Sequence, residues 1–259
     1  MLTSQIDEDS FDSTPMADCS QCQHQHTLLI AGNCKLGHCC VLAESGRQID
    51  RFFKAHPEQA LCYIHDVFWE RRAIAARYLP QNQLITLLAD PDEAVRRVLA
   101  YRLPIDLLLT LRNDEDREVR VTVADRLPTE QLELMADDPD YLVRVYVARR
   151  LPSGRLFRLV ADTDAEVRRI VAERIPQVSL GLLANDPEVT IRRTIVQRMD
   201  VDDIQLMQSD SDWLVRYEVA LRAKQYQLEQ MLSDADAEVR EVVQQRLALM
   251  DMEKEIDDE

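Results

Sequence analysis

The chain has 259 residues, and its 46% apolar content is enough to bury the core of one or two domains or of one repeat array. Its formal net charge of −16 at pH 7 disfavours nucleic acid as a partner. No apolar run approaches the ~20 residues that a membrane helix needs, and the acidic start lacks the basic and apolar regions of a secretory signal. We therefore expect a folded cytoplasmic protein that does not enter a membrane.

Both ends of the chain are acidic. Residues 1–18 carry five Asp or Glu and no Lys or Arg, and residues 250–259 carry six acids against Lys254. Each end thus contributes −5, which leaves −6 for the residues between them. Charged segments with little apolar surface do not fold by themselves, so we expect two disordered acidic tails.

A cluster of cysteines follows the first tail. Five of the six cysteines of the chain are Cys19, Cys22, Cys34, Cys39 and Cys40. The Cys-x2-Cys pair places two thiolates on one turn, and the later cysteines supply further ligands. Because disulfides are rare in a reducing compartment, the cluster predicts a metal-binding domain over residues 19–56. All-sulfur ligation suits both zinc and a 4Fe–4S cluster.

Three histidines, His24, His26 and His38, lie among these cysteines, and a histidine ligand would favour zinc. We interpret each of them as a solvated loop residue. The sixth cysteine, Cys62, lies where the first repeat needs an apolar side chain, and we interpret it as a buried structural thiol.

A 24-residue repeat occupies residues 57–249. Its most regular part reads Val-Arg-x-x-Val-Ala-x-Arg-Leu-Pro. Copies begin at Val95, Val119, Val143 and Val167, with copies lacking the closing proline at Ile191, Val215 and Val239 and a degenerate copy over residues 72–80.

Each repeat is predicted to form one long and one short helix. Val95, Leu99 and Leu103 fall on one helical stripe, and the pair Asp90–Pro91 is expected to provide the N-cap and the first helical residue. The proline after Leu103 ends this helix of roughly 13 residues, and the other half of the repeat suits a short helix of 3₁₀ type. Such pairs bury a core only against their neighbours, so we expect an all-α, superhelical solenoid of about eight repeats.

Two arginine columns run through the array at the repeat spacing. The first is Arg96, Arg120, Arg144, Arg168, Arg192, Arg216 and Arg240, and the second is Arg102, Arg126, Arg150, Arg174, Arg198, Arg222 and Arg246. A phosphate-binding ladder is one interpretation. We favour a structural one, in which the first column bridges to an aspartate column that starts at Asp90 and the second favours the helix dipole.

One stretch of the array, residues 144–158, contains arginines and no acid. These are Arg144, Arg149, Arg150, Arg155 and Arg158. The stretch is a candidate binding site for an anionic partner.

The chain resembles the leucine-rich repeat variant family. The resemblance rests on the 24-residue unit, on the cysteine region, and on the segments at residues 46–53 and 69–80. It implies a right-handed superhelix of alternating α and 3₁₀ helices, a 4Fe–4S cluster on four cysteines, and an association with nitrogen-fixing bacteria. It implies no settled activity.

The same resemblance implies the ligands. Cys19, Cys22 and Cys34 match the family directly, and aligning residues 37–41 places the fourth ligand at Cys40, with Cys39 as the alternative.

We expect a non-catalytic iron–sulfur repeat protein that acts as a scaffold for a protein partner, with a redox or electron-transfer role in nitrogen fixation. A structural cluster, a zinc-binding scaffold and nucleic-acid binding along the arginine columns are the alternatives; the body charge of −6 and the lack of an aromatic column oppose the last. An enzyme is not expected, because phosphate loops, nucleophile elbows and zinc-protease helices are absent from the sequence.

Overall fold

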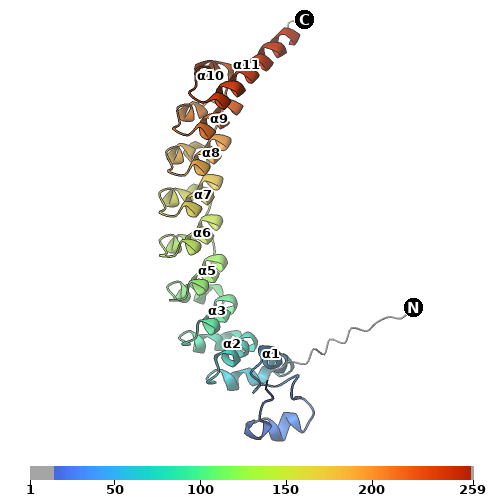
Figure 1. Ribbon diagram of the computed structural model, residues 1–259. Helices are drawn as coiled ribbons and strands as arrows, with labels where there is room; N and C mark the ends of the chain where they lie inside the picture. The colour runs from blue at the N-terminus through green and yellow to red at the C-terminus, as the bar shows by residue number, and fades with distance from the viewer. Residues whose placement is uncertain (1–14, 258–259) are drawn as a thin grey trace, which may run out of the picture. The chain divides into compact units, whose positions relative to one another are not determined.

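The computed structural model describes residues 15–257, and their side chains up to residue 252. The chain divides into two compact units, Met1–Leu127 and Pro128–Glu259. Within the described residues the regular elements are helices, apart from an isolated bridge between Lys35 and Cys39 (Figure 1). The prediction of an all-α repeat fold is confirmed. No helix in this part of the chain combines the length and the apolar character needed to cross a membrane.

The first unit holds the cysteine region and the start of the array. Its long helices have ten residues each and alternate with shorter ones, as the repeat pattern predicts. In chain order the elements are η1 (Cys19–Gln21), η2 (Gln25–Leu29), α1 (Gly46–Ala55), η3 (Pro57–Tyr63), α2 (Trp69–Tyr78), η4 (Gln81–Leu87), α3 (Glu93–Arg102), α4 (Ile105–Leu108), η5 (Leu109–Leu111) and α5 (Arg117–Arg126).

The second unit continues the alternation, and Figure 1 shows α6 to α9 stacked in chain order. Its elements are η6 (Leu132–Met135), α6 (Tyr141–Arg150), η7 (Ser153–Leu159), α7 (Ala165–Arg174), η8 (Gln177–Leu183), α8 (Val189–Arg198), η9 (Ile204–Met207), α9 (Trp213–Arg222), α10 (Gln225–Met231) and α11 (Ala237–Asp257).

The prediction that the C-terminal tail is disordered is wrong up to Asp257, because helix α11 includes these residues. Ala248 stands where the regular repeats have their closing proline, and the residues that follow are mostly good helix formers. The helix therefore continues for 21 residues instead of ending after ten. Residues 1–14 of the predicted N-terminal tail lie outside the described residues.

The long helices begin two residues later than predicted. In α3 the N-cap is Asp92, which accepts a hydrogen bond from the amide of Ala94 at 3.0 Å, whereas Asp90 accepts one from the amide of Asp92 at 2.9 Å. The Asp90–Pro91 pair is thus a turn before the helix, and α3 has ten residues rather than roughly 13. Later repeats follow the same rule, with N-caps at Asp140 and Glu188.

The helix stop and the core positions are as predicted. Leu103, the last residue before Pro104, has extended backbone angles of φ −56° and ψ 143°. Val95, Leu99 and Leu103 are fully buried, and so is Leu108 of the adjoining short helix. One apolar stripe of each long helix therefore packs onto the short helices. Through these contacts a repeat that is too small to enclose a core by itself acquires a hydrophobic core.

The first arginine column bridges successive repeats. Arg96 binds Asp114 through Nε and Nη2 at 2.8 and 3.0 Å, and its Nη1 donates to the carbonyl of Asp90 at 2.8 Å. Equivalent two-bond pairs join Arg72 to Asp90 in the first unit, and Arg144 to Asp162, Arg168 to Asp186, Arg192 to Asp210 and Arg216 to Asp234 in the second. Buried and paired guanidinium groups are not free to bind phosphate, so the structural interpretation is confirmed for these arginine–aspartate pairs.

The second arginine column reaches the helix of the preceding repeat. Arg126 donates to the carbonyls of Ala100 and Leu103, at 2.5 and 3.0 Å, and Arg198 contacts the equivalent carbonyls one helix earlier in its own unit. These carbonyls belong to the last turn of a helix, where intrahelical donors run out. The favourable interaction with a helix C-terminus is thus made across the repeat boundary.

Three of the five arginines at residues 144–158 pair with acids of neighbouring repeats, so the premise of the predicted anionic-partner site does not hold. Arg144 pairs with Asp162, Arg155 with Glu133 at 3.2 Å, and Arg158 with Asp137 at 3.2 Å. Arg149 lies over the ring of Tyr146, with 5.8 Å between the guanidinium carbon and the ring centroid. The stretch lacks acids of its own because neighbouring repeats supply them.

Candidate metal centre

The first two cysteines share one turn, as their spacing predicts. Cys19 begins η1, and the amide of Cys22 donates to the carbonyl of Cys19 at 3.1 Å. Asp18 caps this turn by accepting a hydrogen bond from the amide of Ser20 at 2.8 Å. The turn therefore presents both thiols from a segment of four residues.

The later cysteines sit on a loop that two glycines allow to fold back. Gly32 and Gly37 have φ values of +73° and +74°, a region that residues with a β-carbon rarely adopt. After Gly37 the chain pairs with itself, and the amides of Lys35 and Cys39 each donate to the other residue's carbonyl, at 2.9 and 2.8 Å. This small hairpin delivers Cys39 and Cys40 next to Cys34.

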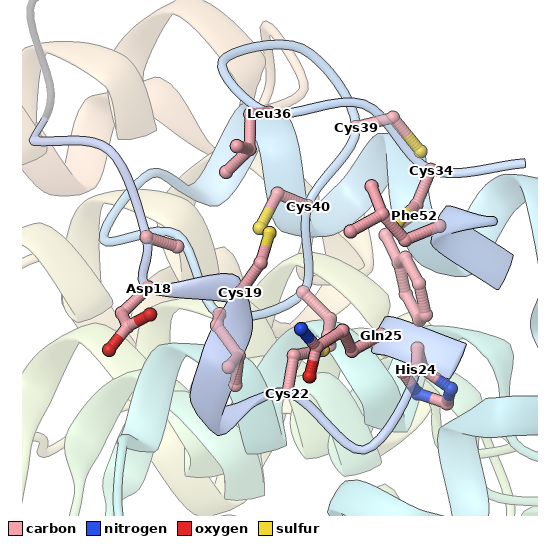
Figure 2. A pocket seen from close by; sticks show the side chains of 14 residues that line it. Asp18, Cys19, Cys22, His24, Gln25, Cys34, Leu36, Cys39, Cys40 and Phe52 are labelled. Carbon is pink, nitrogen blue, oxygen red and sulfur yellow. The ribbon is translucent and has the colours of Figure 1, made fainter. Parts of the chain in front are cut away.

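The five clustered cysteines line one cavity together with His24, Leu36 and Phe52 (Figure 2). The side chains of Cys19 and Cys40 point toward one another, whereas Cys39 points toward Cys34. Cys40 is the most buried, at 7% exposure, and the other four are half-buried. Across the described side chains, no three His, Cys, Asp or Glu groups are arranged to hold a single metal ion.

Burial raises the pKa of three thiols of this cavity, those of Cys34, Cys39 and Cys40. Burial is the main cause for Cys34, and its pKa is raised further by Cys22, Cys40, Cys19 and, least, Cys39. Burial also raises the pKa of Cys40, with added effects of Cys19 and Cys22, while the amides of Leu42 and Ala43 donate to its sulfur and oppose the shift. Thiolates crowded in this way are stabilised when a metal cation lies between them.

Cys39 is the exception within the cluster. Burial raises its pKa, Cys40 is the only other cysteine that adds to the shift, and Arg51 opposes it. Cys39 is therefore the cysteine least coupled to the Cys19–Cys22 turn.

The interpretation of His24 as a solvated residue is wrong. His24 is 6% exposed, and its ring centroid lies 5.2 Å from that of Phe52 and 6.0 Å from that of Tyr63. Its Nε2 atom has no hydrogen-bond partner among the described residues, and burial lowers its pKa. No local pattern indicates this burial, because the aromatic residues that cover His24 come from α1 and η3. His26 and His38 are exposed, as expected.

The prediction for Cys62 is also wrong, since its side chain is exposed and does not line the cavity. Cys62 lies in the 3₁₀ helix η3, where residues three apart share one face. Ala60 and Tyr63 form the buried face of this helix, which turns Leu61 and Cys62 outward.

Arg71 of α2 is a supporting residue that the sequence analysis missed. Its Nε donates to the carbonyl of Val41 at 2.6 Å, and its Nη1 binds Asp66 at 2.6 Å. The amide of Cys40 in turn donates to the carbonyl of Gln48 in α1 at 3.2 Å. The loop that carries Cys40 is thus held by the first helix of the array and by α1.

Comparisons with known proteins agree with both parts of this architecture. Residues 15–61 match the family model described as "LRV protein FeS4 cluster", and residues 117–140 and 141–164 match that described as "Leucine rich repeat variant". A solved structure, "a leucine-rich repeat variant with a novel repetitive protein structural motif", is 52% identical, with a TM-score of 0.78, over 90% of this chain and all of that one.

A curated relative is similar over a shorter segment. The "Uncharacterized 27.7 kDa protein in nifB 3'region" of Rhodobacter capsulatus is 39% identical over 79 residues. These residues make up 30% of this chain, which spans 32% of the length of that relative.

Proposed function

The chain belongs to the leucine-rich repeat variant family, and from this premise we propose that it is a non-catalytic scaffold whose cysteine region holds a 4Fe–4S cluster and whose array binds a protein partner. One observation carries the proposal. Five cysteines from two separate turns line one cavity, within the segment that matches the iron–sulfur model of this family.

We assign Cys19, Cys22, Cys34 and Cys40 as the ligands. Cys40 is buried, points toward Cys19, and receives hydrogen bonds from the amides of Leu42 and Ala43. Backbone amides that donate to sulfur stabilise a thiolate ligand. Cys39 is only half-buried and is coupled to Arg51, so it is the weaker candidate.

The family match supports an iron–sulfur cluster over zinc, because residues 15–61 match the model described as "LRV protein FeS4 cluster". The four ligands of a tetrahedral zinc ion converge on one atom, whereas the thiolates of a four-iron cluster each bind a different iron. All five cysteines of this segment line one cavity. When bound, such a cluster supplies one-electron redox chemistry.

The remaining residues of the site shape and shield it. Phe52 and His24 form an aromatic wall on one side of the cavity and limit the access of water. Gly37 permits the turn before Cys39, and Arg71 fixes the loop after Cys40. These residues preserve the spacing of the ligands when the cavity is loaded.

Exposed apolar side chains support a protein partner for the array. In the second unit, successive short helices expose Leu134, Phe157, Leu182 and Leu206 by 56 to 67%. Repeat proteins commonly bind partners through such extended surfaces. The name of the Rhodobacter capsulatus relative, which places it in a nifB 3' region, supports a role in nitrogen fixation.

Elemental analysis tests the cluster. Protein purified without oxygen is expected to contain iron and acid-labile sulfide, and stoichiometric zinc without sulfide would exclude an iron–sulfur protein. For the scaffold, proteins that co-purify with the wild type are compared with those that co-purify with a Leu182→Asp/Leu206→Asp variant. An unchanged set would show that this surface is not the binding surface.

A further inference from the structure

The cysteine region carries a charge opposite to that of the chain. Residues 19–56 contain four Lys or Arg, namely Lys35, Arg47, Arg51 and Lys54, against Glu44 and Asp50. Their formal charge is +2, within a chain whose net charge is −16. The rest of the chain therefore carries a formal charge of −18, and residues 19–56 form a positively charged region within an acidic chain.

Three of these cations form one line on α1. Arg47, Arg51 and Lys54 occupy positions i, i+4 and i+7, which lie on the same side of a helix. All three are exposed, whereas Ile49, Phe52 and Phe53 are buried on the opposite side. We call Arg47, Arg51 and Lys54 the basic stripe.

The charge of the basic stripe is not neutralised within the described residues. None of its three side chains forms an ion pair there, in contrast to the buried arginine column of the array. The acid nearest in sequence, Asp50, is already bound, accepting a hydrogen bond from Tyr78 at 3.0 Å and lying 3.6 Å from Arg77. The stripe is thus available to an acidic partner.

The basic stripe lies at the edge of the cysteine cavity. Arg51 Nη1 contacts the carbonyl of His38 at 3.4 Å, and His38 directly precedes Cys39. Cys39 in turn lines the cavity. Lys35, in the same hairpin as His38, adds a fourth exposed cation. A protein bound to the stripe would therefore sit over the metal site.

We propose that the basic stripe is the docking surface for an acidic protein that carries single electrons to or from the cysteine cavity. This inference rests on the proposed iron–sulfur function. In the complex one electron passes between the carrier and the cluster, so that one is oxidised as the other is reduced and no bond is made or broken. Complementary charge steers two such proteins into register.

A protein partner fits this surface better than a nucleic acid does. A long polyanion would meet three or four cations here and a charge of −18 over the rest of the chain, which repels it. The large apolar side chains exposed between residues 16 and 61 are Met16, Ile30 and Leu61, so this segment exposes no Phe, Tyr or Trp ring for base stacking.

Binding of a small acidic ferredoxin to the full-length, cluster-loaded chain tests the proposal. Calorimetry at ~20 mM ionic strength compares the wild type with Arg47→Glu/Arg51→Glu/Lys54→Glu. A control of equal charge change, Arg117→Glu/Arg149→Glu/Arg158→Glu, lies on the array. A second variant, Arg47→Glu/Lys54→Glu, leaves the contact between Arg51 and His38 intact. Iron and sulfide content is measured for every variant.

We expect the stripe variants to bind ferredoxin at least ~10-fold more weakly and the control variant to change in affinity by less than about 3-fold. Added salt should weaken binding by the wild type as the Debye length falls below ~10 Å. Equal losses in stripe and control variants would overturn the proposal. So would absence of ferredoxin binding by cluster-loaded protein, or stripe-dependent binding of duplex DNA instead. Absence of iron from the wild type would refute the proposed function itself.

Discussion

The buried pair of Arg168 and Asp186 offers the sharpest test of how successive repeats are held together. Arg168 is 8% and Asp186 is 6% exposed, and two hydrogen bonds of 2.7 and 3.2 Å join them. The substitution Asp186→Asn keeps the size of the side chain and an acceptor for the amide of Glu188, which Asp186 holds at 2.9 Å. It removes the charge that compensates the guanidinium.

Breaking a buried pair from one side costs ~3–5 kcal/mol, because the remaining charge stays buried without a partner. We expect Asp186→Asn to lie near the lower end of this range, since Arg168 also donates to the carbonyl of Asp162 at 2.8 Å. The double variant Arg168→Met/Asp186→Asn should cost clearly less than the sum of its single variants.

Hydrogen exchange is the suitable assay, because repeats contact mainly their neighbours and open locally. Amides of α7 and α8 should lose protection in Asp186→Asn. The matched control is Glu166→Gln, which breaks an exposed pair with Arg169 and should cost at most ~1 kcal/mol. A cost below about 1 kcal/mol for Asp186→Asn, or additive single variants, would refute the view that this pair couples the repeats.

Three further predictions concern other parts of the chain. The hydrogen bond from Arg216 holds the pKa of Asp234 below its usual range. This pair should therefore stabilise the protein above about pH 4 and cease to do so as the pH falls. In urea titrations, Asp234→Asn should reduce the loss of unfolding free energy on acidification. Gly37→Ala should lower the free energy of unfolding by ~1–2 kcal/mol, because φ is +74° there, and should lower the iron content. Gly154→Ala is the control, since φ is not positive at Gly154 and an added β-carbon meets nothing within 4 Å. It should leave the iron content unchanged. Arg71→Met should release the loop at Val41 and speed loss of iron to a chelator; an unchanged rate would show that this loop needs no support.

The repeat fold follows from the sequence because every copy places the same side chains at the same positions. Val95 and Leu99 fix the buried stripe, Pro104 fixes the stop, and spacing alone pairs the arginine and aspartate columns. The N-cap was assigned to Asp90 because a following proline favours that position. A second acidic column, which starts at Asp92 and also recurs every 24 residues, was the signal for the true cap.

The metal centre was less accessible to sequence reasoning. Spacing brought Cys19, Cys22 and Cys34 together, but the choice between Cys39 and Cys40 depends on where a hairpin points two adjacent side chains. Burial of His24 and exposure of Cys62 depend on contacts between elements and on the three-residue period of a 3₁₀ helix. Local patterns do not contain that information.

Mössbauer spectroscopy of protein loaded with ⁵⁷Fe under anaerobic conditions tests the central claim most directly. The wild type and Cys39→Ser should both give the spectrum of a 4Fe–4S cluster, with about four iron atoms per chain. Cys40→Ser should lose that spectrum, because the buried thiol that faces Cys19 is gone. An intact cluster in Cys40→Ser together with its loss in Cys39→Ser would contradict the assigned ligands, and a wild-type chain that takes up no iron would contradict the cluster itself.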